Sequence, residues 1–153
     1  MEKALALAYR FLSFRPRTVF EVETYLKKKA QTYAFTPDEI QAVIELLKGQ
    51  DFLNDATFIK SFVGSRNTLK PKSKRVLMME LKKCGVSPAD INDYFSQNET
   101  NEDELALLAL RKKMKALQNI SDEKKRFIKA ISFLQRRGFS YDIAKNTYRQ
   151  LND

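Results

Sequence analysis

The amino-acid sequence predicts an all-α protein made of three tandem three-helix repeats, stacked into an elongated, curved molecule. Three observations support this prediction. Apolar residues recur at helical spacing along the whole chain, whereas strand-like alternation is absent. Glycine and proline together number only eight. Finally, similar segments recur slightly more than 50 residues apart, as expected of stacked helical modules that share a core.

The helices follow from amphipathic spacing. Ile40, Val43, Ile44 and Leu47 stand at i, i+3, i+4 and i+7, which places them on one face of a helix. Similar apolar lines recur from one end of the chain to the other. They predict helices over residues 3–13, 18–29, 37–48, 55–68, 72–84, 88–96, 102–118, 121–137 and 140–151.

Capping residues mark the helix ends. Thr18 precedes Glu21 by three residues, which is the spacing of a capping box. Thr36 and Ser87 each precede a proline, which favours the first position of a helix. Gly85 and Gly138 follow helices that end in basic residues, so both are predicted helix C-caps.

The repeat is clearest around these two glycines. Leu81–Ile91 resembles Leu134–Ile143, and Leu26–Ile40 is a looser copy with a longer turn. The repeats are therefore expected at residues 1–53, 54–98 and 99–153. The acidic stretch Ser96–Glu104 is the expected linker, and its acids are expected in a solvated turn. The alternative is one irregular helical globule whose segments share only capping residues.

Composition excludes several kinds of chemistry. The chain has one cysteine, Cys84, and no histidine, so the usual zinc sites and imidazole catalysis are excluded. It has neither a glycine-rich phosphate loop nor a G-x-S-x-G turn. We therefore expect no enzyme, cofactor, metal or catalytic residue. No apolar run is long enough to span a bilayer and no signal peptide is evident, so we expect a cytoplasmic protein.

Net charge is +9, and residues 101–153 contribute +5 of it from 12 basic and 7 acidic residues. Such an excess favours polyanionic partners. Basic residues also recur at the ends of the second helices, at Lys27–Lys29, Lys82–Lys83 and Arg136–Arg137, although helix dipoles alone would favour cations there. The cluster of Lys70, Lys72, Lys74 and Arg75 is more suggestive, because four like charges in six residues repel one another.

Most aromatic residues are expected in the core. Phe58, Phe62, Phe127 and Phe133 stand on apolar helix faces, so base stacking is the less favoured interpretation for them. Cys84 corresponds to Arg137 of the third repeat and is expected to be partly exposed.

Four segments in order resemble the RecX regulatory family. Ser13–Thr18 with Glu21–Leu26 is similar to its opening signature, and Phe52–Phe58 to its central one. Lys70–Arg75 with Glu80 and Leu81 resembles its basic turn, and Phe133–Ser140 its closing signature. Asp51 and Ser73 stand where the family commonly has glycine, and Cys84 where it commonly has lysine.

The resemblance implies three tandem three-helix repeats. It also implies a monomer that lodges in the groove of the RecA–single-stranded DNA filament and limits filament growth, strand exchange, ATP hydrolysis and repressor co-cleavage. The contacts carried over from it are Arg15, Arg17, Lys70, Lys72, Lys74, Arg75, Arg136 and Arg137. The basic clusters add Lys82, Lys83, Lys124 and Arg126.

Two other functions remain open at this point. An autonomous, helix-turn-helix-like DNA-binding protein would explain the charge and the short capped helices without RecA. However, no helix has an evident base-reading face. An unrecognised enzyme would need a deep pocket with paired acids.

Overall fold

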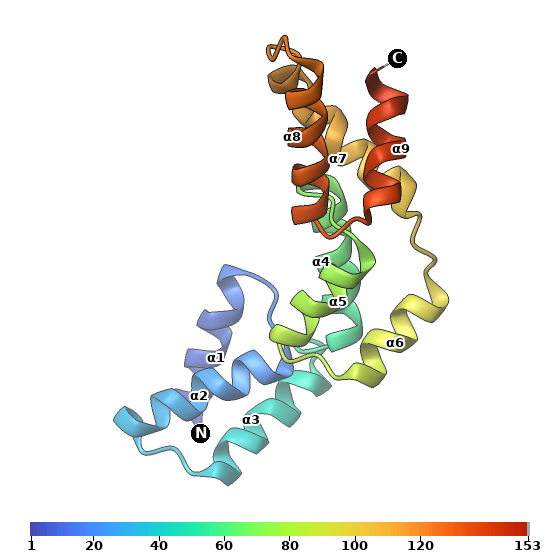
Figure 1. The fold of residues 1–153 in the computed structure, drawn as a ribbon. Helices are drawn as coiled ribbons and strands as arrows, with labels where there is room; N and C mark the ends of the chain where they lie inside the picture. Colours follow the sequence, from blue (N-terminus) through green and yellow to red (C-terminus); the bar gives the residue numbers. More distant parts are fainter. Residues whose placement is uncertain (153) are drawn as a thin grey trace. The chain divides into compact units, whose positions relative to one another are not determined.

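The computed structural model describes residues 1–152, which form nine α-helices and no strand (Figure 1). Their bounds are α1 Glu2–Phe14, α2 Val19–Tyr33, α3 Pro37–Gly49, α4 Asp55–Leu69, α5 Lys74–Lys83, α6 Pro88–Gln97, α7 Glu102–Leu117, α8 Glu123–Arg136 and α9 Tyr141–Asn152. The all-α prediction is confirmed, and every predicted helix is present.

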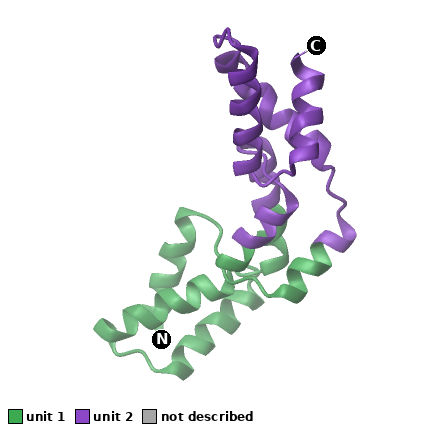
Figure 2. Ribbon diagram, viewed as in Figure 1, with its two compact units in different colours: residues 1–61, 81–94 green, residues 62–80, 95–153 purple. Residues whose placement is uncertain are grey.

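The chain divides into two compact units (Figure 2). The first contains residues 1–61 and 81–94, and the second contains residues 62–80 and the chain from residue 95 onward. Helices α4, α5 and α6 each contribute to both units, so this division runs through the predicted second repeat. The repeat boundaries and the stacked, curved arrangement stay predictions.

The first unit has its core among α1, α2 and α3. Ala4 and Ala8 are fully buried on α1, and such small side chains let neighbouring helices approach closely. Val22, Leu26 and the predicted apolar stripe of α3 complete this core.

The second unit has its core among α7, α8 and α9, which pack against one another. Leu110 and Leu134 are fully buried at its centre, and Phe139 enters from the turn after α8. The aromatic prediction is confirmed in part. Phe58 is buried and Phe62, Phe127 and Phe133 are half-buried.

The prediction that α2 ends at Lys29 is wrong. The helix continues to Tyr33, where Ala34 takes a left-handed conformation (φ 56°) and donates its N–H to the Ala30 carbonyl. Stacking of Tyr33 on Phe35, with ring centroids 5.7 Å apart, holds this longer end. The lysines at 27–29 therefore lie inside the helix, and the helix dipole does not account for them.

The prediction of a linker over Ser96–Glu104 is also mostly wrong. Only residues 98–101 lie between α6 and α7, and three of the four acids, Glu102, Asp103 and Glu104, form the first turn of α7. Asn101 caps this helix by accepting the Glu104 N–H (3.1 Å). Glu102 is not in a solvated turn, because its Oε1 accepts the Lys74 N–H at the start of α5 (2.9 Å).

The two predicted glycine caps have the same backbone geometry. Gly85 (φ 87°) and Gly138 (φ 94°) are left-handed, and each helix end makes a pair of closing hydrogen bonds. Leu81 O accepts the N–H of Val86 (3.2 Å), as Leu134 O does from Phe139 (3.1 Å). This pattern is the Schellman motif, so the capping prediction is confirmed.

Each capped turn contacts the start of a second helix from the preceding predicted repeat. In the first unit, the Thr18 hydroxyl donates to the Cys84 carbonyl (2.6 Å), and a Cβ on Gly85 would lie 2.3 Å from Phe20 Cβ. We call this contact the Gly85 joint; it comprises Thr18, Phe20, Cys84 and Gly85.

The second unit repeats the arrangement. The Ser73 N–H donates to the Arg137 carbonyl (3.0 Å), and a Cβ on Gly138 would lie 2.2 Å from Ser73 Oγ and 2.3 Å from Val76 Cγ2. We call this contact the Gly138 joint; it comprises Pro71, Ser73, Val76, Arg137 and Gly138. Thr18 and Ser73 are both buried residues that precede a helix and accept a helix N–H, so the two joints are equivalent.

Candidate partner-binding surfaces

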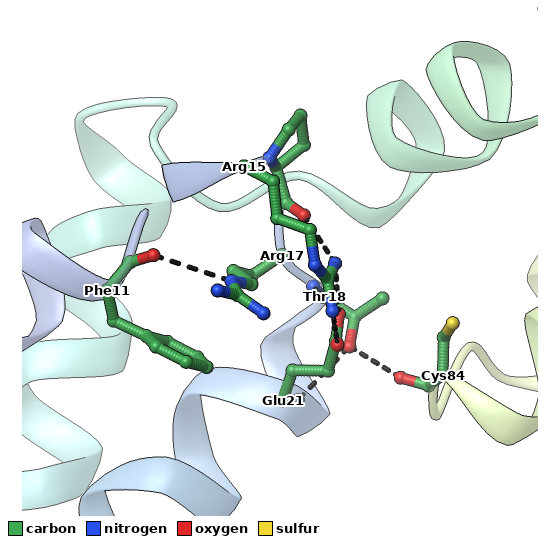
Figure 3. Close-up of polar contacts among 7 residues, drawn as sticks. Phe11, Arg15, Arg17, Thr18, Glu21 and Cys84 are labelled. Carbon is green, nitrogen blue, oxygen red and sulfur yellow. Dashed lines mark hydrogen bonds and ion pairs between the residues drawn. The ribbon is translucent and has the colours of Figure 1, made fainter. Parts of the chain in front are cut away.

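Arg15 and Arg17 stand in the segment between α1 and α2 (Figure 3). Arg15 pairs through both terminal nitrogens with Glu21 and donates to the Pro16 carbonyl (2.8 Å). Glu21 also accepts the Thr18 N–H (3.0 Å), while Thr18 Oγ1 accepts the Glu21 N–H (3.1 Å). The capping box predicted from the sequence is therefore confirmed, and it also orients Arg15.

Arg17 lies against an aromatic pair. Its guanidinium is 3.9 Å from the centroid of the Phe11 ring, and that ring stacks on Tyr25 at 4.1 Å with an interplanar angle of 3°. Burial lowers the pKa of Arg17, the charge of Arg15 lowers it further, and Glu21 acts in the opposite direction. Arg17 is thus held in place by packing, whereas Arg15 is exposed.

Lys82 and Lys83 belong to the same unit as these arginines. They are exposed in the last turn of α5, directly before the Gly85 joint that ties α5 to Thr18. The joint thus brings the end of α5, with its two lysines, to the start of α2, which directly follows Arg15 and Arg17 in the sequence. Cys84 is partly exposed, as predicted, and its carbonyl serves the joint.

Lys72 is not freely available in the second unit. Its ammonium and the guanidinium of Arg66 both bind Glu80, Arg66 at 2.9 Å. Burial alone would raise the pKa of Glu80, but the hydrogen bonds and charges of Lys72 and Arg66 outweigh it and lower the pKa below the usual 4.5. The like-charge repulsion noted in the basic turn is therefore relieved at Lys72 by an internal acid, Glu80.

The other three members of the basic turn differ in setting. Lys74 is half-buried, with its ammonium 5.6 Å from the centroid of Phe95. Lys70 and Arg75 are exposed, and no carboxylate within residues 1–152 forms an ion pair with either. These two cations are the members best placed to meet a partner.

Arg136 and Arg137 also have different surroundings. Arg137 donates to the Pro71 carbonyl (3.1 Å) and lies 4.7 Å from the centroid of Phe133. Burial, and then the charge of Arg136, lower the pKa of Arg137. Arg137 is thus part of the Gly138 joint, whereas Arg136 is exposed and available.

Arg126 and Lys124 also differ in their surroundings. Arg126 donates to the Ile120 carbonyl (2.8 Å) and to the Tyr148 hydroxyl (3.3 Å), so it ties the start of α8 to α9. Lys124 is exposed in the first turn of α8, where Asp122 accepts its N–H (3.0 Å). The structure gives Arg126 an internal role and leaves Lys124 at the surface.

Three cations beside the basic turn were not among the predicted contact residues. Arg66 binds Glu80, Lys112 donates to the Thr68 carbonyl (2.7 Å), and Lys113 lies 5.6 Å from the Phe133 centroid. The similarity of Phe11–Arg15 to Phe62–Arg66 could have indicated Arg66. No sequence signal brings α7 beside the end of α4, because that contact spans 44 residues.

Within residues 1–152, no three potential metal-ligating side chains gather at one place. Over the same residues, no helix is both long and apolar enough to cross a membrane.

Known proteins resemble this chain in sequence and fold. The descriptions of three matching family models are the first, second and third three-helix domains of RecX, over residues 4–47, 54–94 and 101–146. The regulatory protein RecX of Chlorobium limicola is 31% identical over 97% of this chain and 89% of its own length. The crystal structure of RecX from Lactobacillus salivarius is similar with a TM-score of 0.75 and 25% identity, over 99% of this chain and 96% of that one.

Some relatives are longer. The regulatory protein RecX of Streptococcus gordonii is 32% identical over 95% of this chain but only 54% of its own length. The chain thus spans about half the length of several curated relatives that it matches. The tandem three-helix domains confirm the predicted fold class and the resemblance, and the shared name indicates a regulatory role. By domain order, sequence identity and fold, the chain belongs to the RecX family.

Proposed function

We propose that this chain binds the RecA–single-stranded DNA filament and lowers its recombinase, ATPase and coprotease activities, without catalysis of its own. The proposal extends the regulatory role indicated by the family to a specific partner. It also includes a cytoplasmic, monomeric protein whose three repeats span residues 1–53, 54–98 and 99–153.

The observation that carries the proposal is the set of exposed cations without an internal carboxylate. Of the contact residues predicted from the sequence, Lys70, Arg75, Lys124 and Arg136 in the second unit meet this criterion among the described residues, and Lys82 and Lys83 meet it in the first. Uncompensated positive charge favours a polyanionic assembly and speeds association with it. Arg15, Arg17, Lys72, Lys74 and Arg137 then act mainly by shaping these surfaces, and Lys124 is a peripheral contact.

The test is the rate of ATP hydrolysis by RecA on single-stranded DNA as this protein is added. We expect the rate to fall in a saturable manner. The variant Lys70→Glu/Arg75→Glu/Arg136→Glu should need at least about tenfold more protein for the same effect, since three favourable charge contacts become repulsive. These residues suit the test because their reversal breaks no internal ion pair.

A control variant, Arg10→Glu/Lys28→Glu/Lys60→Glu, changes the net charge by the same amount at exposed positions of the first unit. It should inhibit nearly as well as the unmodified protein. An unchanged ATPase rate at all concentrations would refute the proposal. If both variants lost inhibition equally, the effect would be due to total charge rather than to Lys70, Arg75 and Arg136.

A further inference from the structure

We propose that the groove between α7 and α8 is a docking site for an acidic peptide segment with apolar side chains. The groove consists of two hollows of about 470 and 180 Å³ that share Lys113 and Phe133. It lies within the second unit. The inference goes beyond the proposed function, because it names a protein contact that a peptide can test without RecA.

The groove exposes aliphatic side chains that the core does not use. Ile128 lines the larger hollow beside Leu117 and is 53% exposed. Leu69 lines the smaller hollow beside Pro71 and is 73% exposed. Exposed apolar surface rimmed by polar residues is typical of an interaction site, and a partner side chain in either hollow would remove it from water.

The rim of the groove is positively charged. Lys112 and Lys113 come from α7, Lys129 and Arg136 come from α8, and Arg137 follows α8. No acidic residue lines either hollow, and none occurs from residue 105 to 117 or from 124 to 137. This part of the surface therefore attracts carboxylates and has none of its own.

Several of these cations are already oriented. Lys112 is fixed by its hydrogen bond to the Thr68 carbonyl, and Lys113 by its position over Phe133. Lys129 and Arg136 have no carboxylate partner among the described residues. A preorganised set of cations around an apolar floor costs less to bind than a flexible one.

The apolar floor favours a peptide over a nucleic acid. Bases bind single-stranded-DNA-binding proteins mainly by stacking on open aromatic rings. Here the one aromatic ring in the lining, Phe133, already contacts two cations, and the exposed apolar groups are aliphatic. An amphipathic helix in a groove uses apolar anchors three or four residues apart, and acidic residues beside them would meet the rim.

The experiment measures fluorescence anisotropy of a labelled acidic peptide of about 16 residues, with leucine and phenylalanine anchors at helical spacing. We expect saturable binding to the full chain with micromolar affinity. Ile128→Ser and Leu69→Ser, which alter exposed residues, should each weaken it at least about tenfold, as should Lys129→Glu/Arg136→Glu. The same peptide with serine anchors should bind at least about tenfold less tightly.

Leu46→Ser is the control at an exposed aliphatic position outside the groove, since Leu46 lies on α3 and is 36% exposed; this variant should bind normally. Circular dichroism checks that each variant remains folded. The inference would be overturned if the peptide did not bind, or if its affinity were unchanged in Ile128→Ser. The inference would also be overturned if the peptide did not bind and Ile128 were instead required for binding a thymidine oligonucleotide or a second copy of the chain. If the unmodified protein inhibits the RecA ATPase but does not bind the peptide, only this inference is refuted. If it binds the peptide but does not inhibit the ATPase, only the proposed function is refuted.

Discussion

The Gly85 and Gly138 joints join helices in the same way but with different atoms. In the first, the hydroxyl of Thr18 donates to the carbonyl of Cys84. In the second, the backbone N–H of Ser73 donates to the carbonyl of Arg137, whose side chain adds a bond to Pro71. The two joints share a left-handed glycine and the backbone carbonyl of the residue before it, which accepts the hydrogen bond. Backbone geometry therefore specifies the repeat, while the side chains around each joint are free to differ.

The largest effect is expected from the glycines. Gly85→Ala should lower the free energy of unfolding by roughly 2–4 kcal/mol, because it adds left-handed strain and a clash with Phe20. Gly138→Ala should cost somewhat less, since its neighbours include the movable ends of Ser73 and Val76. Urea unfolding followed by circular dichroism measures both.

Gly64→Ala is the matched control for the glycines. Gly64 lies inside α4, and a Cβ there meets no atom within 4 Å. This substitution should stabilise the protein by up to about 1 kcal/mol. If the joint glycines tolerated alanine equally well, backbone geometry would not specify the joints.

The next largest effect is expected from Thr18 and Ser73, which donate the hydrogen bonds of the two joints through a hydroxyl and a backbone N–H, respectively. Thr18→Val should cost about 2–3 kcal/mol, because it removes both the bond to Cys84 and the cap on Glu21. Ser73→Ala should cost only about 1 kcal/mol, because its N–H still serves Arg137 and only the cap on Val76 is lost. Equal losses in urea unfolding would mean that the joints do not differ as described.

A smaller effect concerns the ion pairs beside the Gly138 joint. Because the folded pKa of Glu80 is below its usual 4.5, its contribution is fully present above that value and is lost as the pH falls through the lower folded pKa. Glu80→Gln should therefore destabilise the protein at pH 7, by at most about 1 kcal/mol for this partly exposed cluster. The difference from the unmodified protein should shrink as the pH falls from 4.5 through the lower folded pKa of Glu80, and disappear once the carboxyl is protonated in both the folded and the unfolded state. A constant difference across this range would contradict the role of its charge.

The smallest effect tests a third copy of the same helix end. Asp51 is left-handed (φ 62°), and Leu47 O accepts the Phe52 N–H (2.9 Å), as in the two joints. Asp51→Gly should stabilise the protein by about 0.5–1 kcal/mol, less any loss of the bond from Asn54. Asp51→Ala is the comparison variant and should not stabilise it. A loss of stability in the glycine variant would contradict this interpretation.

Local features of the fold could be predicted from the sequence. Helical spacing and capping residues located the helices, and Gly85 and Gly138 were identified as C-caps because only local backbone geometry was needed. The end of α2 was misplaced because aromatic stacking at Tyr33, which local capping residues do not reveal, extends the helix.

The candidate surfaces were predictable only as a list of cations. Whether a cation meets a partner depends on contacts between distant segments, such as Glu80 with Lys72 or Tyr148 with Arg126. Sequence position alone gave Lys72 and Arg75 equal weight. The structure separates them, because one binds an internal carboxylate and the other is exposed.

We propose above that exposed cations of this chain recognise the RecA–single-stranded DNA filament. The most direct measurement is the anisotropy of the labelled chain titrated with the filament, with RecA alone and with single-stranded DNA alone. We expect tight, salt-sensitive binding to the filament that is weakened at least about tenfold in Lys70→Glu/Arg75→Glu/Arg136→Glu. Equally tight binding to DNA alone, or a filament affinity unaffected by this variant, would contradict it.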